Sequence, residues 1–384
     1  MRIKLVYLLM FGILCVLNIQ ALGVSVDMNA NNGGNTSSFN QNVNWGGIGG
    51  PPAAGNAYST GGYLMRSPAN GSGYLTGDFT FAGDSLTVGY SSTGTNAQNY
   101  AATGYANNNA LLFKLAQQTL TVPNLIMDAG DVRDGLSDGS LEVLAGNMYV
   151  TPNGGGFACQ SLLVVQSAIS GPGPIYIGTE GNVYTDCTHR SILFGSAAST
   201  YQGNIIFNSG NTTVTSQLCL LAGSVMNFAP TANGVTNSIS GLGGGGMLTA
   251  NGTFNIITAG ADTTLGNVWQ LVGPGVVPPT TNIPAGEPGG MLAMYEGDAH
   301  LTGSTAAGNL AFSLTGADSF NVAGFTNEGN GYWAEAIPAS PNYFVFNESN
   351  GTLDVQSVVP EPATIVMILT GLFGMGMIWL RKRS

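Results

Sequence analysis

The chain has 384 residues, only 8% of them charged, and a formal net charge of −11. Ordinary domains carry about 25% charged residues, and binding to nucleic acid needs a positive footprint that this composition lacks. Hydrophobic residues make up 44% of the chain, which is enough for a core and excludes a wholly disordered protein. With 58 glycines and abundant Asn, Ser and Thr, the composition predicts an all-β chain of apolar strands and uncharged polar turns.

The first 23 residues have the features of a secretory signal peptide. Arg2 and Lys4 form a short basic region, and an apolar run follows from Leu5 to Leu17. Ala21 and Gly23 are the small residues of a cleavage site, so we expect the secretion translocon to export the chain and residues 1–23 to be removed. The alternative is an uncleaved N-terminal helix.

Residues 24–78 are rich in Asn and Gly, with Trp45 and a turn at Pro51-Pro52. We predict an irregular N-terminal cap of short strands.

From Phe79 onward a local pattern recurs: apolar, x, apolar, x, x, Gly, x, apolar. Each copy predicts a strand, a corner at the glycine and a second strand, because glycine readily adopts positive φ. The copies are Leu125–Val132, Leu141–Met148 and Leu218–Val225, with a partial copy at Ile205–Thr212 and a longer variant at Ile175–Val183.

Repeated strand–corner–strand units predict a right-handed parallel β-helix, a solenoid, over residues 79–240. An antiparallel β-sandwich is the alternative, since strand number alone does not separate the two folds. The residues expected to face the interior are Leu125, Met127, Leu141, Val143, Ile205, Phe207, Leu220 and Val225.

Two segments carry a resemblance to a known group of proteins. Phe81–Val88 reads FAGDSLTV and Asn124–Gly130 reads NLIMDAG. They are similar to the autotransporter-associated β-strand repeat proteins of the bacterial surface. The resemblance implies a β-helical, passenger-like stalk.

Beyond the solenoid, a glycine-rich linker is expected at residues 241–251 and a small β-sandwich-like module at residues 252–357. Its predicted strands include Thr253–Ile257, Gly266–Val272 and Tyr343–Phe346. The expected core aromatics of the module are Trp269, Phe325, Trp333 and Phe346.

Two formal motif matches lack their structural context. Gly135–Gly139 fits the G-x-S-x-G nucleophile elbow, which needs a strand before it, a helix after it and a nearby His and acid. Gly241–Gly246 fits the dinucleotide fingerprint, which must open a helix. We interpret them as a polar turn and a joint, and expect no cofactor.

Four acidic residues, Asp128, Asp131, Asp134 and Asp138, cluster around Arg133. Carboxylates and turn carbonyls are calcium ligands, so these four are weak calcium candidates. Their spacing fits no EF-hand, however. A solvated loop balanced by Arg133 is the favoured interpretation, and no metal is predicted.

The candidates for enzymatic chemistry are sparse. His189 and His300 each lie in a local polar cluster without a visible nucleophile. A β-helical polysaccharide lyase needs a base beside acidic residues, and Arg133 or Arg190 is the available choice. We predict no catalytic residue and no enzyme; a polysaccharide lyase or hydrolase on the β-helix is the alternative.

Cys159, Cys187 and Cys219 remain after removal of the signal peptide. We favour three buried reduced thiols, and one disulfide plus a free thiol is the alternative in an oxidising compartment.

The tail, residues 358–384, has three parts: Pro360-Glu361-Pro362, an uncharged apolar run from Ala363 to Leu380, and Arg381-Lys382-Arg383. As a helix the run would rise roughly 27 Å, about the thickness of a bilayer's hydrocarbon core. The tail therefore predicts a transmembrane helix over 363–380 with its basic end in the cytoplasm. A plain membrane anchor is the simplest interpretation.

The order and terminal position of these three parts resemble the PEP-CTERM sorting signal. That resemblance implies processing near the tripeptide by an exosortase, a membrane-embedded protease, in a Gram-negative bacterium that often produces extracellular polysaccharide. The exported part keeps four basic residues against 19 acidic ones. We therefore expect a structural or adhesive protein of the cell surface or extracellular matrix, associated with exopolysaccharide and not with nucleic acid.

Overall fold

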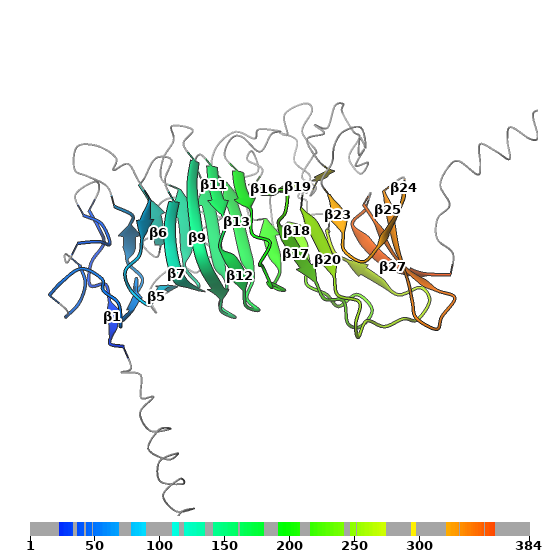
Figure 1. Cartoon of the computed structure of the whole chain (residues 1–384), viewed down its shortest axis with the longest axis horizontal. Coiled ribbons are helices and arrows are strands. Elements are labelled where there is room, and N and C mark those ends of the chain that lie inside the picture. Colours follow the sequence, from blue (N-terminus) through cyan, green and yellow to red (C-terminus); the bar gives the residue numbers. More distant parts are fainter. Residues whose placement is uncertain are drawn as a thin grey trace, which may run out of the picture.

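The structure is a computed structural model, and it is shown in Figure 1. It describes residues 23–33, 37–41, 44–47, 49–68, 78–89, 110–114, 119–134, 141–159, 162–179, 191–207, 216–241, 246–250, 252–273, 293–296, 320–329, 331–348 and 350–357. Within these ranges the regular elements are β-strands and no helix occurs.

The longest sheet runs along one side of the molecule in the order β1-β2-β5-β7-β9-β11-β14-β16-β19-β22, with β4 and β12 joining at its margins. Its strands are β1 (Ser25–Asp27), β2 (Ala57–Ser59), β4 (Phe79–Thr80), β5 (Ser85–Gly89), β7 (Thr119–Asp128), β9 (Leu141–Val150), β11 (Leu162–Val165), β12 (Ala168–Ser170), β14 (Ser191–Phe194), β16 (Ser216–Leu220), β19 (Gly246–Ala250) and β22 (Ala293–Glu296).

Two further parallel sheets complete the coil. One has the order β18-β15-β13-β10-β8-β6-β3 and the other the order β17-β20-β23. Their strands are β3 (Leu64–Arg66), β6 (Ala110–Phe113), β8 (Asp131–Asp134), β10 (Gly155–Cys159), β13 (Ile175–Thr179), β15 (Ile205–Phe207), β17 (Val225–Phe228), β18 (Ile239–Gly241), β20 (Thr253–Ile256) and β23 (Asn321–Val322).

The chain visits these sheets in turn, so each strand pairs in parallel with the strand one coil further on. Gly155 pairs with Ile175, Ile175 with Ile205 and Ile205 with Ile239, so successive coils advance by 20, 30 and 34 residues. The fold is therefore all-β and β-helix-like, as expected. These parallel ladders differ from the antiparallel pairing of a β-sandwich.

Two predicted corners are confirmed. Between β7 and β8, Ala129 has a φ of 62°, and a Cβ on Gly130 would lie 2.5 Å from the carbonyl oxygen of Val88. Between β16 and β17, Gly223 has a φ of 83°, a conformation that glycine adopts without steric cost.

The predicted corner at Gly146 is wrong. Gly146 lies inside the continuous ten-residue strand β9, with a φ of 107°. A Cβ there would lie 1.9 Å from the carbonyl oxygen of Val122. The facing strand shifts register between Val122 and Asn124, so glycine here accommodates a β-bulge in the neighbouring strand and not a corner.

The inward-facing residues were predicted in part. Leu141 is 38% exposed and Val143 faces outward, whereas the core side of β9 carries Glu142 and Leu144. Val225 is only half-buried, and its neighbour Met226 points into the core instead. The predictions that are confirmed as core residues are Leu125, Met127, Ile205, Phe207 and Leu220.

The expected N-terminal cap contains the first coils. β1 pairs with β2, β2 with β5, and β3 with β6, all in parallel. Edge-to-face aromatic contacts close this end: Tyr58 packs on Trp45 and Phe81, and Phe81 packs on Phe39. The Trp45 indole N–H also donates to the carbonyl oxygen of Phe39 at 2.9 Å.

The coil also continues beyond its expected end. β19 lies within the predicted linker and pairs with β16, and β20 pairs with β17. The remaining C-terminal strands form one antiparallel sheet, the cap sheet, in the order β21-β27-β26-β25-β24. Its strands are β21 (Val268–Gln270), β24 (Thr326–Gly329), β25 (Tyr332–Ala336), β26 (Tyr343–Asn347) and β27 (Thr352–Gln356).

The cap sheet shares one core with the last coils. Phe254 in β20 makes edge-to-face contacts with Phe228 at 5.0 Å, Phe320 at 5.0 Å and Phe346 at 5.8 Å, measured between ring centroids. The four expected aromatics, Trp269, Phe325, Trp333 and Phe346, are all buried. The cap sheet lies at the opposite end of the molecule from β1 (Figure 1).

Candidate functional site

The predicted acidic cluster does not converge on one point. Asp128 is half-buried at the end of β7, where its Oδ1 accepts hydrogen bonds from Thr151 Oγ1 at 2.6 Å and Asn153 Nδ2 at 2.8 Å. Asp131 and Asp134 lie an odd number of positions apart on β8, so they point to opposite faces of the strand. Asp138 lies outside the described residues. No group of three or more potential metal ligands occurs among the residues that the structure describes.

Arg133, the candidate base, is only 1% exposed. It shares a face of β8 with Asp131, which is 2% exposed and whose Oδ1 accepts no hydrogen bond. Burial raises the pKa of Asp131 well above its usual value, and the Arg133 guanidinium lowers it by less. Both side chains are therefore covered by the protein itself in this structure.

Further charged groups lie on the coils next to Arg133. Burial lowers the pKa of Lys114; Arg66 lowers it further and Asp134 raises it. Phe113, which precedes Lys114, pairs with Asp134 across β6 and β8. Glu142 is fully buried on the core side of β9. Arg66, Lys114 and Asp134 thus lie near enough to interact on neighbouring coils of one sheet, whereas Glu142 belongs to another sheet.

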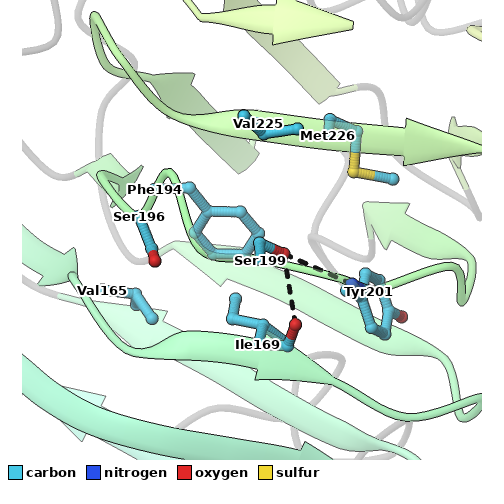
Figure 2. A pocket seen from close by; sticks show the side chains of 8 residues that line it. All are labelled: Val165, Ile169, Phe194, Ser196, Ser199, Tyr201, Val225 and Met226. Atoms are coloured by element: carbon cyan, nitrogen blue, oxygen red, sulfur yellow. Dashed lines mark hydrogen bonds between the residues drawn. The ribbon is translucent and has the colours of Figure 1, made fainter. Parts of the chain in front are cut away.

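A small internal cavity lies between the coils formed by β11, β12, β14 and β17 (Figure 2). Ser199 Oγ donates to the carbonyl oxygen of Ile169 and accepts from the Tyr201 amide at its margin. The Tyr201 hydroxyl lies 2.7 Å from the carbonyl oxygen of Gly173 and 2.8 Å from that of Asn204. The cavity measures about 10 Å³, room for at most one water, so it is a packing void and not a ligand site.

The cysteines differ from the favoured expectation of three reduced thiols. Cys219 is disulfide-bonded, whereas Cys159 is a buried thiol on the core side of β10. Cys219 lies on the outer face of β16 and packs against Val164 and Leu193 in a small second apolar cluster. Cys187 lies outside the described residues.

Other predicted sites also fall outside the described residues. These are Ala21 of the signal-peptide cleavage site, the G-x-S-x-G match, both histidines with Arg190, and the whole sorting tail with Pro360, Glu361, Pro362, Arg381, Lys382 and Arg383. Gly23 is described, and a Cβ there would lie 2.1 Å from the carbonyl oxygen of Gly55. No helix of membrane-spanning length and apolarity occurs in the part of the chain that the structure describes.

Comparison with known proteins finds no similar protein. No family model, curated protein or solved structure matches the chain.

Three features were not the favoured expectation from the sequence. The Cys219 disulfide matches the alternative of one disulfide plus a free thiol, and choosing it needs spatial proximity that an odd number of cysteines does not reveal. Trp333 donates its indole N–H to the buried carboxylate of Glu348, a pairing set by the register of the cap sheet. The third feature is the exposure of three apolar side chains: Val235 and Leu265 lie outside the strands, and Val268 lies on the outer face of β21.

Proposed function

We propose that this chain is an exported, non-enzymatic structural protein of the cell surface or extracellular matrix of a Gram-negative bacterium. A right-handed parallel β-helix forms its stalk, and the tail with its helix over residues 363–380 anchors the precursor in the inner membrane. The exosortase then processes the tail. The stalk associates with extracellular polysaccharide through its uncharged polar faces.

The observation that carries the structural role is the continuity of the core. One cluster of buried side chains extends from Val26 in β1 to Val355 in β27. A coil that buries apolar side chains in every turn is a rod whose stability comes from nearest-neighbour stacking. Such a rod holds its two ends apart, which is the mechanical task of a surface stalk.

The Cys219 disulfide supports the exported location. Disulfides persist in oxidising compartments and are rare in the cytosol, where thiols are kept reduced. The signal-peptide pattern at residues 1–23 and the tail at residues 358–384 are consistent with the same destination.

The buried position of Arg133 weighs against the alternative of a polysaccharide lyase or hydrolase. A base must come within hydrogen-bond reach of the proton that it removes from a bound sugar. Arg133 is 1% exposed on the face of β8 opposite the core residue Val132, so its side chain would first have to become exposed.

The test combines fractionation with a glycan assay. Cells that express the chain are separated into cytosol, membranes, surface and matrix, and the purified protein is incubated with the polysaccharide of the same cells. We expect the chain in the surface or matrix fraction, bound to polysaccharide that stays intact. Unsaturated sugar products would establish the lyase instead, and a cytosolic chain would contradict the proposal.

A further inference from the structure

Three large apolar side chains are strongly exposed at the C-terminal end of the rod. Val235 and Leu265 are each 57% exposed and Val268 is 43% exposed. We call them the rim patch. Single exposed apolar residues are normal, but adjacent ones indicate a contact surface.

Hydrogen bonds hold the three residues close together. The amide of Gly234, next to Val235, donates to the carbonyl oxygen of Val268 at 2.9 Å. The amide of Gly266, next to Leu265, donates to the carbonyl oxygen of Val355 at 3.0 Å, and Val268 pairs with Asp354 on β27.

The direction of the patch follows from the alternation of β21. Trp269 is fully buried, with its indole N–H bonded to the carbonyl oxygen of Ala232 at 2.6 Å. The neighbouring Val268 therefore points away from the core. Val268 is thus held on the outside of the cap sheet, next to the buried Trp269.

The patch lies beside the strand from which the chain enters its tail. β27 ends at Gln356, and six residues, 357–362, separate it from the apolar run that begins at Ala363. Six residues span at most about 20 Å when fully extended. A membrane-inserted tail would therefore keep the end of β27, and the rim patch beside it, close to the bilayer surface.

We propose that Val235, Leu265 and Val268 contact the lipid bilayer while the tail is inserted. This inference rests on the proposed anchoring by residues 363–380. The contact would hold Pro360-Glu361-Pro362 at the membrane surface, within reach of a membrane-embedded protease. The tether makes the contact intramolecular, so a weakly apolar patch is sufficient.

The charges near the patch specify the lipid. The segment 231–273 contains no Lys or Arg, and its one acidic residue is Asp262, whose carboxylate is exposed and bonded to Thr264. Half-buried Asp354, the cross-strand partner of Val268 on β27, adds a second acidic group beside the patch. An anionic surface would repel this segment. The patch therefore fits a zwitterionic bilayer, and the contact should be insensitive to salt.

The test uses the full chain in phosphatidylcholine vesicles that contain lipid brominated near the headgroup. Leu265→Trp places a fluorophore in the patch. Leu141→Trp places a control at an exposed apolar position on the solenoid, far along the sequence from the cap sheet. The emission that each variant adds to the wild-type signal is compared with and without brominated lipid.

We expect brominated lipid to reduce the added emission of Leu265→Trp roughly twofold or more, because interfacial side chains lie within the headgroup and upper acyl region. The control should be unchanged. Replacing Val235 and Val268 by Ser in the Leu265→Trp chain should abolish the quenching. Equal quenching with and without those two substitutions would show that the inserted tail alone brings residue 265 near the lipid, without contact by Val235 and Val268. That result would overturn the inference.

Flotation of the wild-type chain separates the two proposals. A chain that does not float with the vesicles contradicts the membrane anchor and this inference together. A chain that floats, but whose Leu265→Trp signal is no more quenched than that of Leu141→Trp, contradicts this inference alone.

Discussion

Trp333 in β25 donates its indole N–H to the carboxylate of Glu348, which lies just after β26. Both residues are buried, and Phe320 packs edge-to-face on the Trp333 ring at 5.9 Å. The bond thus joins two strands of the cap sheet at the point where that sheet meets the last coil. Because an unsatisfied buried polar group destabilises a fold, we expect the stability of the cap sheet to depend on this bond.

Replacing Trp333 with Phe keeps a ring but removes the donor to Glu348. We expect a loss of about 1–3 kcal/mol in the free energy of unfolding, because the buried Glu348 side chain loses a hydrogen-bond donor. Glu348→Gln keeps an acceptor oxygen and should cost less. Urea titration followed by circular dichroism measures both. Equal losses in the two variants would show that this bond contributes little.

Phe254 is expected to couple the cap sheet to the coil. It is fully buried and contacts aromatic rings from both parts. Phe254→Ala should lower the free energy of unfolding by about 3–5 kcal/mol, while the exposed control Val235→Ala should change it by less than about 0.5 kcal/mol. A chain in which the cap alone melts early, with the coil unchanged, would contradict a shared core.

Asp131 is expected to make the protein less stable as pH rises. Its pKa is raised in the folded state, so the unfolded chain releases this proton first. Stability contributed by the neutral acid is present below the unfolded pKa and is lost as pH climbs through the folded pKa. Asp131→Asn should raise the free energy of unfolding at pH 7 by about 1–2 kcal/mol and leave it nearly unchanged at pH 4.

Asp262 provides the control of opposite sign. Hydrogen bonds from the Thr264 side chain and backbone lower its pKa. Its contribution is present above the unfolded pKa and is lost as pH falls through the folded pKa. Asp262→Asn should therefore remove a small stabilisation at pH 7. Thermal melts of both variants at the two pH values test the pair, and a destabilised Asp131→Asn at pH 7 would show that pairing with Arg133 outweighs burial.

The Cys219 disulfide should stabilise the exported protein. Reduction, or Cys219→Ala, should lower the free energy of unfolding by about 2–4 kcal/mol, because the unfolded chain regains conformational freedom. Cys159→Ala should leave the response to reductant unchanged, since that residue is a buried thiol. Thermal melts with and without dithiothreitol measure the difference. A wild-type chain that melts identically in both conditions would contradict the bond.

Local signals predicted the class of fold and two of its corners. Gly130 and Gly223 carry a conformational or steric requirement that the sequence shows directly. Gly146 has a similar local sequence, but it lies opposite a bulge in the facing strand β7. The position of that bulge depends on the register between two strands, which the local sequence does not show. Leu141 was misplaced for this reason.

The limits of the coil and the accessibility of candidate sites depend on long-range packing. The glycine-rich stretch after Gly241 indicated a linker, yet β19 pairs with β16 across it. Arg133 and Asp131 looked solvated because charged residues usually are, yet both are buried. The extent of the coil and the burial of these two side chains do not follow from composition, because both depend on which residues the neighbouring coils cover.

The most direct test of the account is the intact mass of the mature chain recovered from the surface of cells that encode an exosortase. We expect an N-terminus at Val24 and a C-terminus close to Pro360, with both ends processed only when the secretion translocon and the exosortase are present. A chain recovered from the cytosol with its full sequence from Met1 to Ser384 would contradict it.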